Sequence, residues 1–171
     1  MASIIGVETL QHTNGTTAAT IDSSGRILQP ANPKFSASLA VSSALVDYTS
    51  DTDVLFDTID FNVGNCIALS SNAVTFTAPI TGYYQFNLTV SLGSIDGSGY
   101  ISTYLVIDDE TPDNPTYRNI EDTQGGGFVT AFTGALIYLT ANQRVNPIVN
   151  VNTDTTANIR PGTRFSGFLV G

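Results

Sequence analysis

Apolar and polar side chains alternate along much of the chain with a period of two residues. The clearest case is YYQFNLTVSL, residues 83–92, in which the five even positions are all apolar and the odd positions are polar or Tyr83. A β-strand has this period because successive side chains point to opposite faces. The segment APITG, residues 78–82, precedes it with the proline and glycine of a turn. We therefore predict a strand with one face in a dry core.

The same pattern predicts a series of strands from Phe35 to the end of the sequence. They lie near 35–43, 53–61, 73–76, 83–92, 100–107, 128–139, 144–151 and 163–170. Short strands at this spacing, separated by turn residues, are typical of an antiparallel sandwich. Composition agrees, because Lys34 is the only lysine, glutamates are few, and strand and turn residues dominate. The predicted fold class is all-β.

The first 34 residues differ from the rest in amino-acid composition and in the spacing of apolar residues. They are polar and rich in turns, with HTNGTT and DSSGR between short apolar pieces, and QPANPK closes the segment. Pro30 and Pro33 favour an extended chain there. Such a segment is too thin to hold a core, so we expect short strands that order only against another body. The predicted organisation is an arm over 1–34 and a domain over 35–171.

Two of the predicted strands, 100–107 and 128–139, carry apolar side chains on both faces. An antiparallel sandwich needs only one apolar face for each strand. The second face is covered either by loops of the same subunit or by another subunit. We favour contact between subunits.

Three spacings in the sequence resemble those of a known family, the globular head of the first complement component in the tumour-necrosis-factor-like superfamily. The matching residues are Phe56 and Asn62, then Phe76, Gly82, Tyr84 and Phe86, and finally Phe165, Gly167 and Phe168. The sequence departs from the family pattern at Ile67 and Leu88, where the family has aromatic residues. ALSSNAVT, residues 68–75, is interpreted as a turn that tolerates insertion.

The resemblance implies an antiparallel jelly roll of about ten strands that forms a tight homotrimer. A threefold axis would explain the strands with two apolar faces. From their parity and bulk, Tyr100, Tyr104, Phe128 and Phe132 are the candidate trimer-interface residues. Members of the superfamily commonly bind partners through loops at one end, where three copies give avidity. Here the corresponding loops are 93–99, 108–126 and 152–162.

The arm carries a second resemblance. GVETLQHTNGTTAATIDSSGRI is similar to the N-terminal segments of structural proteins in tailed bacteriophages, where a short arm often anchors a trimeric knob. This similarity implies a virion protein assembled in the bacterial cytoplasm: the knob of a head or tail fibre, acting in host attachment. Its partners would be its own copies, other virion proteins through the arm, and a host-surface glycan or protein. The alternatives are a capsid decoration protein and a free carbohydrate- or protein-binding module.

Charge and apolar-run length restrict the partners further. The formal net charge is −9 and the sequence pI is about 4.1. This sign of charge repels phosphate backbones and anionic lipids, so neither nucleic acid nor membrane insertion is expected. There is no apolar run near 18 residues and no basic, apolar leader at the start. Cys66 is the only cysteine, which excludes an intrachain disulfide and fits a reducing compartment.

Candidate catalytic chemistry is sparse, and we predict that the chain is not an enzyme. His12 is the only histidine, so a zinc site or a serine-type triad lacks its usual residues. A glycosidase pair of carboxylates stays as an alternative that no local motif selects. DTQGGGF, residues 122–128, lacks the lysine of a phosphate-binding loop and is predicted to be a turn.

One loop is strongly acidic. DDETPDNP, residues 108–115, holds four carboxylates, which indicates either a solvated hairpin loop or a calcium site. The loop lacks the alternating ligands and central glycine of an EF-hand, so the solvated loop is favoured. We predict no cofactor, with calcium as the alternative.

Overall fold

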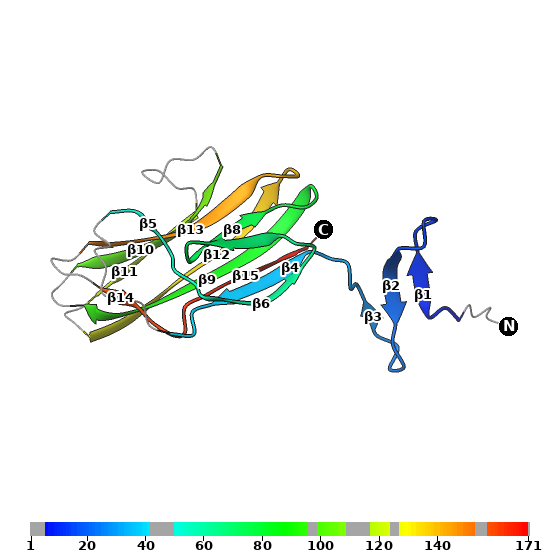
Figure 1. Cartoon of the computed structure of the whole chain (residues 1–171), viewed down its shortest axis with the longest axis horizontal. Helices are drawn as coiled ribbons and strands as arrows, with labels where there is room; N and C mark the ends of the chain where they lie inside the picture. Colours follow the sequence, from blue (N-terminus) through cyan, green and yellow to red (C-terminus); the bar gives the residue numbers. More distant parts are fainter. Residues whose placement is uncertain are drawn as a thin grey trace.

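The structure is a computed structural model that describes residues 6–41, 50–95, 99–108, 117–123, 127–152 and 157–170. These residues form strands, turns and loops, which confirms the all-β prediction. Within these ranges no helix is present that could span a membrane. Figure 1 shows two bodies, a sandwich over 34–170, here called the head, and a small sheet within 6–33, here called the arm.

Two antiparallel sheets form the head (Figure 1). The first sheet has the order β12 (Gly127–Leu139), β9 (Gly82–Ile95), β15 (Arg164–Leu169), β4 (Lys34–Ser38) and β6 (Thr58–Val63), with β14 (Asn158–Ile159) paired to β9. The second sheet has the order β11 (Tyr117–Asp122), β10 (Tyr100–Ile107), β13 (Arg144–Asn152), β8 (Ala73–Thr77) and β7 (Ile67–Ser70), with β5 (Thr52–Asp53) paired to β13. The predicted jelly-roll sandwich is confirmed.

An aromatic cluster fills the space between the two sheets. The even positions of β9 from Tyr84 to Leu92 are fully buried, as the alternation predicts. Six buried rings make contacts with centroid distances between 4.9 and 6.4 Å, namely Phe35, Phe56, Phe76, Tyr84, Phe86 and Phe165. Phe86 lies centrally, because it contacts four of the other rings. These rings join strands that are far apart in sequence into one core.

The predicted strand 53–61 is wrong as a single element. The chain forms β5 in the second sheet, crosses the sandwich and then forms β6 in the first. At the crossing, the Val54 amide donates to the Pro147 carbonyl and the Phe56 amide to the Asn72 carbonyl. The side chains of Val54 and Phe56 are both fully buried, so the apolar alternation continues through the crossing. The sequence pattern therefore does not reveal where the chain changes sheet.

The interpretation of residues 68–75 as an inserted turn is also wrong. These residues lie within the hairpin of β7 and β8, whose two-residue turn is Ser71–Asn72. Both turn residues have positive φ, 51° and 66°. Positive φ at both positions is the geometry of a tight type I′ hairpin, in which asparagine and glycine are the usual residues. The predicted turn is therefore present but only two residues long, and strand β7 before it was missed.

The predicted strand 35–43 ends earlier, at Ser38, and β11 was not predicted. After β4 the Leu39 amide donates to the Thr163 carbonyl, and the Asp57 carboxylate then accepts from the amides of Ala40 and Val41. These bonds lower the pKa of Asp57, the Ala40 amide contributing most. Strand β11 is an edge strand with mostly polar side chains, so it lacks the apolar alternation that reveals a strand.

The arm is a three-stranded antiparallel sheet, in the order β1 (Thr9–Gln11), β2 (Thr17–Ile21) and β3 (Ile27–Leu28). The turn between β2 and β3 is built on Asp22, whose carboxylate accepts from the amides of Ser24 and Arg26 and pairs with the Arg26 guanidinium at 2.7 Å. These bonds, the Arg26 amide first, lower the pKa of Asp22. The arm lies beyond the end of the head that carries the C terminus (Figure 1).

Candidate binding surface

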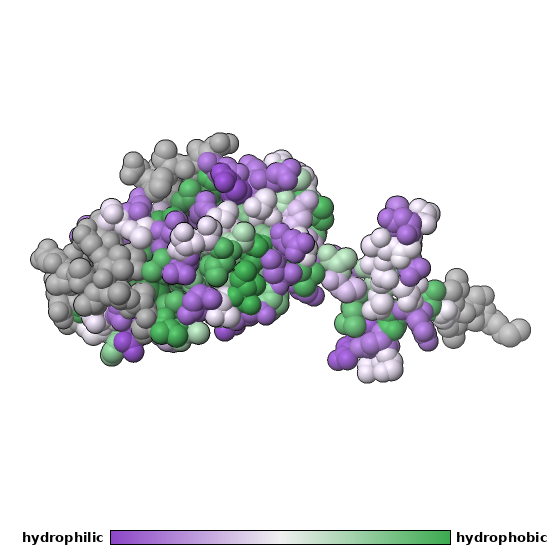
Figure 2. Space-filling model, in the orientation of Figure 1, coloured by the Kyte–Doolittle hydropathy of each residue, from purple (hydrophilic) through white to green (hydrophobic). Residues whose placement is uncertain are grey.

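The first sheet turns a largely apolar surface away from the core, here called the outer face. Its large apolar side chains are between 47% and 71% exposed and comprise Phe61, Tyr83, Phe128, Phe132, Leu136, Tyr138 and Phe168. The period of two explains the arrangement, because the alternate residues Ala131, Ala135 and Ile137 of β12 are buried in the core. Hydrophobic patches interrupt the hydrophilic surface of the head in Figure 2. An apolar area of this kind indicates a surface that binds another molecule.

The aromatic side chains of the outer face are supported by their neighbours. The rings of Tyr83 and Tyr138, paired across β9 and β12, have centroids 5.1 Å apart. The Arg160 guanidinium lies 4.5 Å from the centre of the Phe128 ring, a cation–π contact. A Cβ added at Gly93 would lie 2.5 Å from Arg160 Cδ and 3.0 Å from Phe128 Cε1. The missing side chain of Gly93 therefore makes room for both groups.

A polar cluster interrupts the apolar surface between β4, β6 and β15. The Asp60 carboxylate accepts from the hydroxyls of Ser36 at 2.7 Å and Ser38 at 2.8 Å, and the Arg164 guanidinium lies 3.8 Å away. The hydrogen bond from Ser36 is the largest cause of the lowered pKa of Asp60. The carboxylate thus stays ionised, which gives the outer face a fixed polar group that can orient a partner.

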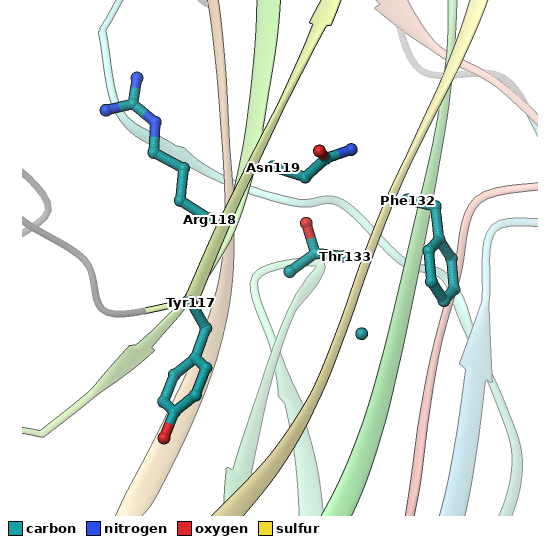
Figure 3. Close-up of a pocket in the computed structure, with 6 residues that line it drawn as sticks. Tyr117, Arg118, Asn119, Phe132 and Thr133 are labelled. Atoms are coloured by element: carbon teal, nitrogen blue, oxygen red, sulfur yellow. The ribbon is translucent and has the colours of Figure 1, made fainter.

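An open groove of about 420 Å³ runs between the edges of the two sheets, next to the outer face (Figure 3). Its lining residues are Tyr117, Arg118 and Asn119 from β11 and Phe132, Thr133 and Gly134 from β12. The Thr133 hydroxyl donates to the Thr103 carbonyl of β10 at 2.8 Å, which fixes the position of this side chain. The side chains of Asn119 and Thr133 lie between the two strands (Figure 3). This lining offers hydrogen bonds and aromatic contact, which suits binding, and it has no carboxylate, histidine or cysteine for acid–base or nucleophilic chemistry.

The four predicted interface residues fall into two separate pairs. Phe128 and Phe132 lie on the outer face. Tyr100 and Tyr104 lie on β10, in the second sheet. Tyr104 is already 1% exposed in the single subunit, where it clusters with Val106 and Ile148. The Tyr100 hydroxyl accepts from the Asn152 amide group at 3.2 Å.

The other outer-face side chains were not predicted as interface residues. Leu136 and Tyr138 share the parity of Phe128 and Phe132 along β12, which was the sequence feature that could have identified them. Phe61, Tyr83 and Phe168 come from three other strands. They join the surface only through the strand order β12–β9–β15–β4–β6, which single-strand periodicity does not give.

The family-motif residues have structural roles. Phe56, Phe76, Tyr84, Phe86 and Phe165 are core residues, and Gly82 begins β9. The Asn62 amide group donates to the Ile67 carbonyl at 2.9 Å, and its oxygen accepts from the Cys66 amide at 2.8 Å. Asn62 therefore closes the turn between β6 and β7. A Cβ at Gly167 would lie 2.8 Å from Phe35 Cε1 and 2.9 Å from the Gln85 carbonyl, so only glycine fits. Phe168, by contrast, lies on the outer face.

The remaining candidate groups show no catalytic arrangement. Cys66 is fully buried, and burial raises the pKa of its thiol to about 11, so the thiolate is scarce at neutral pH. His12 is exposed in the arm, with Nδ1 accepting from the Asn14 amide. Asp108 pairs with Arg144 at 2.6 Å, while residues 109–115 of the proposed calcium loop lie outside the described residues. Searched over its described ranges, the chain has no group of three or more metal-ligating side chains.

Parts of the three predicted receptor-binding loops meet at one end of the head, whereas Asp108, the first residue of the second loop, lies at the other end. Asn158, in the third loop, pairs with Gly93 in the first. The Thr123 amide, in the second loop, donates to the Gly99 carbonyl in the first at 3.0 Å. Residues 96–98, 109–116, 124–126 and 153–156 of these loops lie outside the described residues. Gly93, Gly99, Thr123 and Asn158 thus lie at one end of the sandwich. The predicted second loop differs, because its residues 117–122 form β11 and Asp108 bonds to Arg144 at the opposite end.

Comparison with known proteins adds a family and a fold. A family model described as the C1q domain matches residues 34–170. The crystal structure of murine APRIL at pH 8.0 superposes with a TM-score of 0.56 over 81% of this chain and 98% of that chain, at 12% sequence identity. At this identity the likeness shows a shared fold. No curated protein matches the sequence.

Proposed function

Because the chain belongs to the C1q domain family, we propose that it is the trimeric knob of a bacteriophage fibre that binds the host surface. Domains of this family are generally non-enzymatic modules that form homotrimers and bind receptors. The observation that carries the proposal is the outer face, where seven large apolar side chains are exposed on one sheet. Two further copies of the head cover this face, and the loop residues around Gly93, Thr123 and Asn158 at one end of each head are left free to bind.

The composition of the outer face supports association with like subunits. Aromatic residues are enriched at the centres of protein interfaces, and six of the seven exposed side chains are phenylalanine or tyrosine. Five of these six lie on the adjacent strands β12, β9 and β15, and Phe61 lies on β6. Asp60 and Arg164 supply the polar contacts that fix the orientation of the neighbours. Once three heads are joined, three weak loop contacts act together with high avidity.

The virion role rests on the arm. Its sequence is similar to phage N-terminal segments, and its sheet lies at the end of the head where β4 begins, opposite to the end where Gly93 pairs with Asn158. An anchor at one end and receptor contacts at the other are the arrangement a fibre tip requires. The proposed location is therefore the virion, with the arm bound to other virion proteins and no cofactor in the knob.

Self-association is tested by native mass spectrometry and sedimentation of the full chain at micromolar concentration, where we expect a stable trimer. Phe132→Glu and Leu136→Glu each place a charge on the outer face at half-exposed positions and should give folded monomers. Ile120→Glu is the matched control, since Ile120 is 54% exposed on β11 of the second sheet and the substitution should leave the trimer intact. A wild-type chain that stays monomeric would overturn the proposal.

The virion role is tested separately. We expect portal, capsid or tail genes beside the coding sequence, and binding of the labelled full chain to intact cells of the host bacterium. A trimer found on purified particles without binding to cells would indicate a decoration protein instead. A chain encoded far from any virion gene would support the free binding module.

A further inference from the structure

The arm exposes an apolar sheet face of its own. Leu10 pairs with Ala19 across β1 and β2, and Ile21 pairs with Ile27 across β2 and β3. Since Leu10 and Ala19 are paired and Ala19 and Ile21 are two residues apart, all four side chains lie on the same face, here called the arm face. The opposite face carries Thr9, Ala18, Thr20 and Leu28. The arm is therefore amphipathic across its whole width, with one apolar residue or more from each strand.

Nothing in the described chain covers the arm face. Leu10 is 52% exposed and Ile27 is 68% exposed, and Ala19 is the one buried hydrophobic residue in the described arm. A sheet that is apolar on one face buries that face against another structural element. The regular pairing of the arm, with closed turns at Gly15 and Gly25, indicates a folded element whose second layer comes from another molecule.

The position of the arm identifies that molecule. The chain leaves the arm at Pro33 and enters β4, the strand that lies between β15 and β6 in the first sheet. The Leu169 amide donates to the Pro33 carbonyl at 2.9 Å, so the start of the head is fixed to β15. A groove of about 330 Å³ joins the two bodies and is lined by Ile27 and Leu28 of the arm and by Phe168 of the outer face, among others. Apolar surface thus continues from the outer face onto the arm.

We infer that the arm faces of three copies pack on one another and form a stem that continues the trimer of heads. The inference rests on the proposed self-association, because heads joined through the outer face bring their three β4 strands close together. The arms are then held at an effective concentration on the order of millimolar, without any further binding step. Leu10, Ala19, Ile21 and Ile27 of each copy supply the dry centre of the stem. The opposite faces, with Thr9 and Thr20 beside Ala18 and Leu28, and the turns remain outside, available to the rest of the virion.

Cysteine cross-linking of the full chain tests the stem. Ile21→Cys introduces a thiol in the arm face, and Ala18→Cys introduces one on the opposite face of the same strand. The native Cys66 is fully buried and does not compete. Under mild oxidation we expect Ile21→Cys to form disulfide-linked dimers within each trimer, and Ala18→Cys to remain as single chains on a non-reducing gel.

Hydrogen exchange gives a second, independent measurement. In the full-length trimer the amides of β1 and β2 should be protected, and Ile21→Asp should speed their exchange by more than about tenfold. Ala18→Asp should leave this protection unchanged, and neither variant should alter exchange in β9.

The two proposals fail in different ways. A trimer with no cross-link through position 21 and unprotected arm amides would overturn the stem and leave the trimeric knob standing. Cross-linking through position 18 in place of 21 would also overturn the stem, since it would put the wrong face inside. A monomer by native mass spectrometry would overturn the knob, and the stem with it.

Discussion

The arm and the head are built from the same kind of antiparallel strand, but they bury very different amounts of apolar surface. In the head, the apolar face of one sheet packs against that of the other, and six aromatic rings are buried between them. In the arm, the same period of two leaves Leu10, Ile21 and Ile27 exposed. Alternation therefore specifies a strand in both regions, whereas independent stability requires a second layer that only the head has.

The hydrogen bonds of the two regions differ in the same way. The arm is held by local bonds, such as that of the Thr16 amide to the side chain of Asn14. The head is held by bonds between residues far apart in sequence, such as Thr75 to Asn146 and the Ser91 amide to Thr163. Long-range bonds break only when the whole sandwich opens, so the head should unfold as one cooperative unit.

The largest expected effect is on the aromatic core. Phe86→Ala removes a fully buried ring that contacts four others, and should lower the free energy of unfolding by about 3–5 kcal/mol. Leu10→Ala in the arm should lower it by less than about 0.5 kcal/mol, because the side chain is exposed in the single subunit. Both free energies are measured by urea denaturation, with each substitution made in the monomeric Phe132→Glu variant. Similar decreases in the free energy of unfolding for Phe86→Ala and Leu10→Ala would contradict the difference in burial between head and arm.

Backbone packing in the head gives the next effect. A methyl group at Gly167 meets Phe35, Phe86 and the Gln85 carbonyl, so Gly167→Ala should cost about 1–3 kcal/mol. Gly6→Ala in the arm is the control, since no heavy atom lies within 4 Å of an added Cβ. Thermal unfolding compares the two. An unchanged midpoint for Gly167→Ala would show that the sheets separate easily at this point.

Alkaline pH should also act on the head. Burial raises the pKa of Cys66 from 9.0 to about 11, so the unfolded chain loses its thiol proton at a lower pH than the folded chain. The stabilising contribution is complete below pH 9 and is lost as the pH rises towards 11, by on the order of 1–2 kcal/mol. Urea midpoints between pH 8 and 11 should fall for the wild type and fall less for Cys66→Ala. Parallel curves for the two proteins would contradict this.

Low pH should have the smallest effect on stability, and this effect should differ between the arm and the head. The pKa values of Asp60 in the head and Asp22 in the arm are both lowered, by hydrogen bonds from Ser36 and from the Arg26 amide respectively. Each group stabilises its fold above the ordinary aspartate pKa, and this stabilisation is lost as the pH falls through the lowered value. Asp60→Asn should reduce the acid sensitivity of global unfolding, and Asp22→Asn should change only hydrogen exchange in the arm. A global effect of Asp22→Asn would show that the arm and head unfold together.

The sequence predicts the central strands and the aromatic core well, for a physical reason. In β9, burial on one face and exposure on the other leave no alternative to strict alternation, and Phe76, Tyr84 and Phe86 are buried as their spacing requires. Strand β11 was missed because it is an edge strand with mostly polar side chains. Strand β7 was missed because its four residues, IALS, are too few and too uniformly apolar to show alternation. The crossing between β5 and β6 was missed because Val54 and Phe56 stay buried through it.

The candidate surface was predicted only in part. Apolar residues on both faces of β10 and β12 predict a second cover for each strand. For β10 the second cover lies within the subunit, and Tyr104 is buried there. For β12 the second face, with Phe128 and Phe132, is exposed. Side-chain parity does not distinguish a strand covered by its own chain from one covered by a neighbour.

The junction between Pro33 and β4 has a mechanical consequence. All five residues of β4, from Lys34 to Ser38, pair with β15 on one side, and β6 pairs on the other. Tension applied through the arm runs along this inner strand, so it shears two ladders of hydrogen bonds at once and does not peel one rung at a time. The head can therefore hold a load applied through the arm without being pulled apart at its edge.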